Sequence, residues 1–194
     1  MRALHICLGL LCVPVFQLSN SIVSADEPAA GEKTVEVQAQ DLKLNVPASW
    51  KNQQPSNNLR LLQFEIPSAE DGQDAIEFVV FPPFGGSVSD NVRRWIDQFE
   101  AGDRKVTTVQ GDSTQGKYVL VDLAGTYKKP DGPPILRRTT PTPDYRMVAV
   151  MLTSKSGGNY FLKMVGPSES VAQQIEAFRK SYGADKESEQ PYAL

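Results

Sequence analysis

Residues 145–165 read YRMVAVMLTSKSGGNYFLKMV, and this stretch decides the predicted fold. Every side chain from residue 147 to residue 152 is apolar, so both alternating faces of a strand here would be apolar. A strand of this kind lies at the centre of a sheet that is covered on both sides. The turn signal SGGN at 156–159 predicts that residues 160–165 return antiparallel, as the second strand of a hairpin.

Other strand patterns flank this hairpin along the chain. Alternating or continuous apolar runs, several of them ending at a proline, occur at residues 35–37, 42–46, 59–66, 75–81 and 118–127. Together with the hairpin they predict an antiparallel sheet of about six strands.

Two segments carry the apolar stripe of an amphipathic helix. In the first, Val92, Trp95, Ile96 and Phe99 recur at the spacing of one helix face. Residues 171–182 repeat this pattern near the end of the chain. The predicted class is therefore α+β, with helices packed on both faces of the antiparallel sheet.

The chain divides into four predicted segments. Residues 1–25 combine a basic start, an apolar run and the small-residue sequence VSA, which is typical of a signal peptide cleaved after residue 25. Residues 26–33 predict a flexible mature N-terminus, residues 34–184 a single domain, and residues 185–194 a polar C-terminal tail. We expect the protein to be exported, to the periplasm or to the outside of the cell.

The predicted signal peptide contains His5, Cys7 and Cys12, which are all the histidine and cysteine residues of the chain. The mature chain is therefore expected to have no disulfide, no cysteine nucleophile, no Ser-His-Asp triad and no imidazole-bound zinc. Leu10 and Leu11 precede Cys12 where a lipoprotein has small residues, so lipidation is disfavoured. The sequence indicates no catalytic residue, no metal ligand and no cofactor, and it favours a non-enzymatic function.

The charge of the chain narrows the class of partner. The formal net charge is −3, and the mature chain is slightly more negative because Arg2 leaves with the signal peptide. A mildly acidic protein is not a general nucleic-acid binder. No later segment has the apolar length of a membrane-spanning helix, so no transmembrane span is expected in the mature chain. The sequence does not specify an oligomeric state.

Gly85 and Gly86 lead into the first predicted helix and raise the question of an anion site, because a helix N-terminus favours negative charge. The lysine that a P-loop carries after its last glycine is absent. Ser87 and Ser89 offer helix caps instead. We favour a turn with a cap, and the anion site remains the alternative.

Four carboxylates crowd the stretch around residue 72, namely Glu70, Asp71, Asp74 and Glu77. Oxygen ligands at close spacing suit calcium. Their spacing does not fit an EF-hand loop, and a solvated acidic turn is the favoured interpretation.

Residues 128–146 form the most unusual stretch, KKPDGPPILRRTTPTPDYR. Its five basic residues are Lys128, Lys129, Arg137, Arg138 and Arg146. They outnumber its two acids in an otherwise acidic protein, and its five prolines exclude a regular helix. Because long loops are often functional, one interpretation is a basic surface that docks an acidic partner, a polyanion or a membrane headgroup. The partner expected from this is an envelope or secreted protein. The alternative is a solvated hairpin extension in which Ile135 and Leu136 pack back on the sheet.

Two short motifs resemble those of PsbP-like and DcrB-like exported proteins. Residues 46–50 read VPASW after an alternating strand, and residues 163–167 read KMVGP before the closing helix. The resemblance covers most of the mature chain in the order of its elements. It implies an α/β/α sandwich, an antiparallel sheet with helices on both faces, and an accessory or binding role without catalytic residues. No functional residue is carried over.

These observations favour an exported, non-enzymatic accessory or binding domain that docks an envelope or protein partner. One alternative is a carrier of a small ligand or metal, with its pocket on the sheet face under the helix that contains Trp95. A second alternative is a hydrolase that uses carboxylates alone, with Asp122, Asp144 and the acids around residue 72 as its candidate acids.

Overall fold

The computed structural model describes residues 33–132, 136 and 138–194. The predicted signal peptide lies outside the described residues, as does the predicted flexible N-terminus apart from Lys33. Arg137 of the basic stretch lies outside them too. In the part of the chain that the structure describes, no helix is both long enough and apolar enough to cross a membrane.

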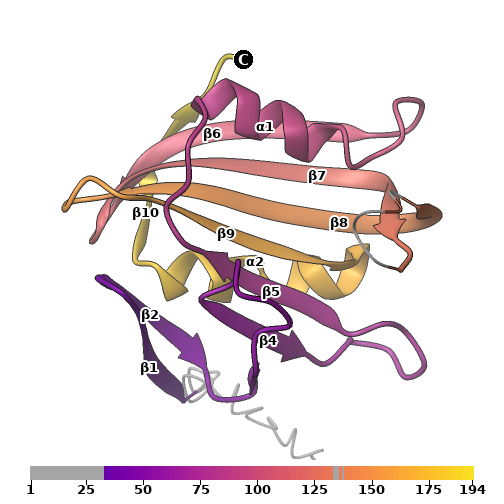
Figure 1. Cartoon of the computed structure of the whole chain (residues 1–194), viewed down its shortest axis with the longest axis horizontal. Helices are drawn as coiled ribbons and strands as arrows, with labels where there is room; N and C mark the ends of the chain where they lie inside the picture. Colours follow the sequence, from indigo (N-terminus) through magenta and orange to yellow (C-terminus); the bar gives the residue numbers. More distant parts are fainter. Residues whose placement is uncertain (1–32, 133–135, 137) are drawn as a thin grey trace, which may run out of the picture. The chain divides into compact units, whose positions relative to one another are not determined.

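Within the described residues, eight strands form one antiparallel sheet in the order β10-β6-β7-β8-β9-β5-β4-β3 (Figure 1). Its central strands are β7 (Gly116–Pro130), β8 (Thr139–Ser154) and β9 (Asn159–Pro167). The outer strands are β3 (Lys51–Gln53), β4 (Leu62–Ile66), β5 (Ile76–Phe81), β6 (Lys105–Ser113) and β10 (Ala184–Pro191). Strands β1 (Thr34–Ala39) and β2 (Leu42–Pro47) pair with each other in a separate two-stranded sheet.

The apolar pattern predicted for both faces of residues 147–152 is confirmed in β8. Val148, Val150 and Leu152 belong to one buried hydrophobic cluster. Residues 147, 149 and 151 belong to a second cluster, on the opposite face of the same strand. The turn at 156–159 returns the chain antiparallel into β9, with Thr153 opposite Asn159.

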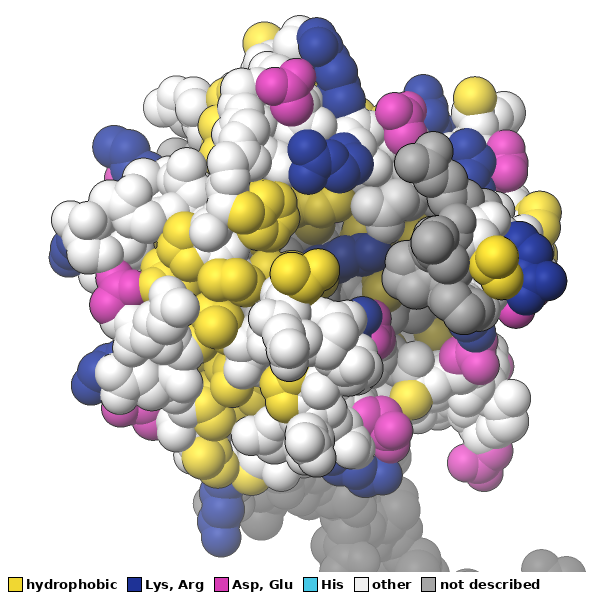
Figure 2. Space-filling view, in the orientation of Figure 1, with side chains coloured by type: hydrophobic (Ala, Val, Ile, Leu, Met, Phe, Trp, Pro, Cys, Tyr) yellow, Lys and Arg dark blue, Asp and Glu magenta, His cyan; other side chains and the backbone are white. Residues whose placement is uncertain are grey.

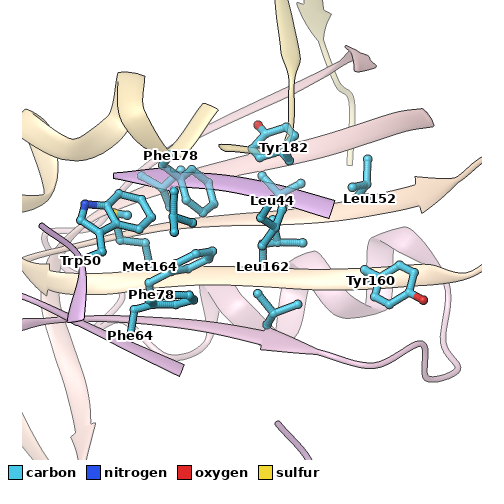
Figure 3. Close-up of a cluster of buried hydrophobic side chains, with 14 of the residues drawn as sticks. Leu44, Trp50, Phe64, Phe78, Leu152, Tyr160, Leu162, Met164, Phe178 and Tyr182 are labelled. Atoms are coloured by element: carbon cyan, nitrogen blue, oxygen red, sulfur yellow. The ribbon is translucent and has the colours of Figure 1, made fainter. Parts of the chain in front are cut away.

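One helix packs on each face of the sheet. α1 (Val88–Ile96) buries Trp95 in the cluster on one face, and α2 (Ser168–Ser181) buries Phe178 in the cluster on the other. The β1–β2 hairpin shares the α2 face and adds Leu44 to its core, close to Phe178 in Figure 3. An α+β fold built on an antiparallel sheet is therefore confirmed, but the helices do not cover the two faces alike.

The predicted count of about six strands is too low. The sheet also contains β3 and β6, which were not predicted because neither has the alternation of apolar and polar residues that indicates a strand. β6 reads KVTTVQGDS and has no buried residue. Its position is set by backbone pairing with β7, from Lys105 opposite Ala124 to Ser113 opposite Gly116, which a hydrophobic pattern does not report.

The predicted polar tail at 185–194 also needs correction. Residues of β10 pair with β6, which makes this segment an edge strand of the sheet. Glu189 on β10 pairs with Arg179 of α2 at 3.0 Å, and it accepts a hydrogen bond from the Tyr118 hydroxyl at 2.8 Å. The side chains of Glu189 and Arg179 are only 12% and 14% exposed. A polar sequence is therefore ordered here by an ion pair that is largely removed from water.

Candidate binding site beside helix α1

The sheet face that carries α1 is only partly covered by that helix. α1 lies along β7 (Figure 1), and Val92, Trp95 and Phe99 enter the apolar cluster of this face. Beyond the helix the same face continues over β9, β5 and β4. Lys163 on β9 is opposite Val79 on β5, so these side chains lie in one row across the uncovered strands.

Lys163 lies between Phe161 and Val165 of β9, both of which are buried in the apolar cluster of this face. Its Nζ donates to Gln98 Oε1 at 2.7 Å and to the Tyr127 hydroxyl at 3.4 Å, and it lies 5.5 Å from the centroid of the Tyr127 ring. Burial lowers the pKa of Lys163 to about 8, because desolvation disfavours the charged ammonium.

Two other charges lie close enough to act on Lys163. Glu77 on β5 raises the pKa of Lys163, and Arg60 lowers it. Arg60 Nη1 donates to Glu77 Oε1 at 2.5 Å, while Arg60 Nε is buried and has no hydrogen-bond partner among the described residues. No described carboxylate lies within ion-pair distance of Lys163, since Glu77 pairs with Arg60 instead. Two cations thus lie near a single carboxylate, which pairs with Arg60 and not with Lys163.

Aromatic side chains border one side of this cluster. Phe84, in the loop between β5 and α1, stacks on Phe161 with ring centroids 4.0 Å apart and an interplanar angle of 15°. Trp95 of α1 meets Phe161 edge-on at 6.1 Å, and Phe81 meets Phe84 edge-on at 6.4 Å. Phe84 is 43% exposed, whereas Phe161 is buried.

The hairpin of β7 and β8 borders another side. The Tyr127 and Tyr145 rings stack at 5.8 Å, and burial raises the pKa of Tyr127 to about 12. The Tyr145 hydroxyl donates to the Asp74 carboxylate, which also pairs with Lys129 at 2.6 Å. These contacts tie the hairpin to the loop before β5 and hold the Tyr127 ring beside Lys163.

Figure 2 shows this face from the side of α1, with hydrophobic side chains gathered around a hollow that has basic side chains near its centre. We name this arrangement the Lys163 site. It consists of Lys163, Arg60, Glu77, Gln98, Tyr127, Phe84 and Phe161. A cation with neutral partners and an adjoining aromatic surface can hold an anion that carries an apolar group.

The loop at Gly85 and Gly86 turns into α1 in the way that the capping interpretation predicts. Ser87 is the N-cap, and its Oγ accepts from the Asp90 N–H at 3.1 Å. The same hydroxyl donates to the Asp90 carboxylate at 2.7 Å. The cap at Ser87 is confirmed, and the alternative of an anion at this loop has no support from these contacts.

The basic stretch at 128–146 is largely a hairpin extension, as its alternative interpretation predicts. β7 and β8 remain paired as far as Pro130 opposite Thr139. A bulge at Asp144, whose φ is 56°, shifts the register between Gly125 and Tyr127. Leu136, predicted to pack back on the sheet, is 52% exposed, and Ile135 lies outside the described residues.

Three of the basic residues in this stretch have partners within the chain. Arg146 donates to both carboxylate oxygens of Asp122, at 2.8 and 2.6 Å. Lys129 has the ion pair described above, and Lys128 donates to a backbone carbonyl at the end of α1 at 3.2 Å. Arg138 is exposed. The four basic residues of this stretch that the structure describes therefore do not form one free basic surface, and partner docking stays a prediction.

The predicted acidic candidates are also dispersed. Asp74 and Glu77 are held by the contacts given above, and no group of three or more potential metal-ligating side chains occurs among residues 33–132, 136 and 138–194. Asp122 is occupied by Arg146, whereas Asp144 lies at the bulge of β8. Among the described residues these acids form no metal-ligating group, and the carboxylate hydrolase stays a prediction.

The sequence analysis predicted a pocket under the Trp95 helix, whereas the Lys163 site lies beside that helix, and its residues were not identified as a site from the sequence. Lys163 is the single charged residue in the apolar run FLKMV, and this interruption of the run is the sequence feature that could have indicated a functional lysine. Arg60 and Gln98 gave no signal of their own, because they reach Lys163 through pairings that link distant parts of the chain.

No protein-family model matches this chain, and no curated protein sequence matches it. The solution structure of cyanobacterial PsbP (CyanoP) from Synechocystis sp. PCC 6803 is similar, with a TM-score of 0.46 and 10% sequence identity. That alignment covers 88% of this chain and 99% of the other. The DcrB-like part of the resemblance stays a prediction.

Proposed function

We propose that this protein is a non-enzymatic binding domain that holds a small anionic ligand at the Lys163 site. The main support is the environment of the Lys163 ammonium group, which lies on a largely apolar sheet face. It donates hydrogen bonds to the neutral side chains of Gln98 and Tyr127, and no carboxylate among the described residues pairs with it. A charge in such a position is costly unless an opposite charge accompanies it.

An anionic ligand would supply that opposite charge. At pH 7 most of the Lys163 side chain is protonated, since its pKa is lowered only to about 8. The buried Nε of Arg60 gives a second donor without a partner in the described residues. Charge-assisted hydrogen bonds to an anion are worth about 1.5–3 kcal/mol each, so the loss of one weakens binding roughly 10- to 100-fold.

The test compares octanoate with 1-octanol, which share a chain and differ in charge. Isothermal titration calorimetry of the protein should show octanoate binding and a clear preference over 1-octanol. Lys163→Met should remove that preference. Lys186→Met is the matched control, because Lys186 is 61% exposed on β10 and pairs with Glu176 at 2.9 Å.

Two results would count against the proposal. Equal affinity of the wild-type protein for octanoate and 1-octanol would mean that charge is not recognised. An undiminished octanoate preference in Lys163→Met would place the anion elsewhere. Unchanged binding in Lys186→Met, together with lost preference in Lys163→Met, supports the site as described.

A further inference from the structure

The stacked pair of Phe84 and Phe161 indicates the shape of the group that lies beside Lys163. Phe161 presents one ring face toward this side of the sheet, and Phe84 covers it at 4.0 Å with nearly parallel rings. Phe84 is 43% exposed and precedes Gly85 and Gly86, the second of which has a φ of +108°. A ring that is half in water at the end of a glycine loop can leave its stacking position at small cost.

The charges around the site favour a single negative charge. Lys163 and Arg60 contribute two positive charges, and Glu77 contributes one negative charge. At the rim, Lys129 is neutralised by Asp74. One monoanion therefore balances the cluster, whereas a dianion leaves an excess negative charge beside apolar side chains.

The distance between Phe161 and Lys163 limits the length of the ligand. Phe161 and Lys163 are two residues apart on one strand and point to the same face, so their Cα atoms lie about 7 Å apart. A ring and an acid group joined by a short linker span that distance.

From these observations we propose that the Lys163 site binds an aromatic monocarboxylic acid, whose ring stacks on Phe161 in place of Phe84 and whose carboxylate pairs with Lys163. This inference rests on the proposed function and names the ligand class of the same site. It adds a role for Phe84, which occupies the ring position when the ligand is absent.

The experiment compares three probes by isothermal titration calorimetry. 3-Phenylpropionate has the ring and one charge, 3-cyclohexylpropionate keeps the charge without the planar ring, and 2-phenylethyl phosphate keeps the ring with a second charge. Because aromatic pairs add about 0.5–1.5 kcal/mol beyond their area, 3-phenylpropionate should bind about 2- to 10-fold more tightly than 3-cyclohexylpropionate. At pH 7, where the phosphate is mostly dianionic and Lys163 is mostly protonated, 2-phenylethyl phosphate should bind more weakly than 3-phenylpropionate.

Two variants separate the ring from the charge. Phe84→Ala frees the stacking position, so it should strengthen 3-phenylpropionate binding; Phe84 is half exposed, and its loss leaves the core intact. Phe161→Leu should abolish the preference for the planar ring and keep the preference for acid over alcohol. Trp95, edge-on to Phe161, provides an emission change on binding as a second readout.

The inference fails if 3-cyclohexylpropionate binds as tightly as 3-phenylpropionate, or if Phe84→Ala weakens the aromatic acid. Absence of 3-phenylpropionate binding, with octanoate still bound in a Lys163-dependent way, overturns the aromatic class and leaves the proposed function standing. Absence of charge preference for every probe overturns the proposed function itself.

Discussion

Replacing Lys163 by methionine should make the folded protein more stable at neutral pH. Burial lowers the pKa of Lys163 from 10.5 to about 8. A depression of that size means that the buried ammonium costs the folded state on the order of 3 kcal/mol. Methionine keeps most of the side chain's volume and removes the charge. Because the contacts with Gln98 and Tyr127 are lost, we expect a net gain of about 1–3 kcal/mol in the free energy of unfolding at pH 7.

The sign of the pH dependence follows from the same shift. A lysine whose pKa is lower in the folded state binds fewer protons there than in the unfolded chain between about pH 8 and 10.5. The full cost of the ammonium applies below pH 8 and is relieved as the pH rises through that range. The wild-type protein should therefore approach the stability of Lys163→Met as the pH is raised from 7 to 9.5.

Urea denaturation followed by the emission of Trp50 and Trp95 measures this difference, because both indoles are buried in the folded protein. Wild type, Lys163→Met and the exposed control Lys186→Met should be compared at pH 7 and pH 9.5, at equal ionic strength. A Lys163→Met protein that is less stable at pH 7 would refute the reasoning. So would a stability difference that does not shrink at pH 9.5, since the cost would then not come from the charge.

Two further predictions concern how the fold is held together. Glu189→Gln should lower the free energy of unfolding by about 3 kcal/mol or more, because it leaves the guanidinium of Arg179 without a carboxylate in a site that is largely out of water. The control Lys186→Gln breaks an exposed ion pair and should lower the free energy of unfolding by less than about 1 kcal/mol. Equal effects of the two substitutions in urea denaturation would contradict this prediction. Ser87→Ala should lower the free energy of unfolding by about 1 kcal/mol, because the N-cap hydrogen bond to the Asp90 N–H is lost, and Ser87→Gly should lower it by much less. An unchanged melting temperature in Ser87→Ala would contradict a stabilising role of this cap.

Hydrophobic patterning predicts the centre of this sheet and fails at its edge. β8 is found because both of its faces are buried, so its sequence alone reveals a central strand. β6 and β10 are polar and lie at one end of the sheet, where pairing of backbone groups and one buried ion pair order the chain. Neither interaction leaves a periodic signal, so residues 185–194 read as a tail.

The sequence predicted the face of the sheet on which the candidate site lies, but not its place on that face or its composition. The Trp95 stripe predicts a helix over an apolar sheet face and a pocket under that helix, whereas the Lys163 site lies beside the helix on uncovered strands. The composition depends on register, because Lys163, Val79 and Gln63 become neighbours only after β9, β5 and β4 have paired. The partners of Lys129 and Arg146 also come from register, and their ion pairs remove them from the surface that the charge count predicted.

The dimensions of the two faces explain why a polar site lies on only one of them. α2 and the β1–β2 hairpin together cover their face, and Trp50, Phe64, Phe78 and Phe178 fill the space between (Figure 3). α1 lies along β7, so across the sheet it covers only its own width of about 10 Å, whereas eight strands extend over about 34 Å. One helix along β7 therefore leaves β9, β5 and β4 to be covered by side chains alone.

Since no helix covers β9, β5 and β4, polar side chains are expected on this surface, but a charged residue at position 163 is not. A glutamine at position 163 could donate to Gln98 without the desolvation cost of an ammonium. Solubility does not require the charge either, since Lys163 is partly buried and its ammonium is turned toward Tyr127. An ammonium that costs the folded state stability, beside a second cation and a single carboxylate that pairs with that cation, is what an anion-binding site requires and what a structural role alone does not.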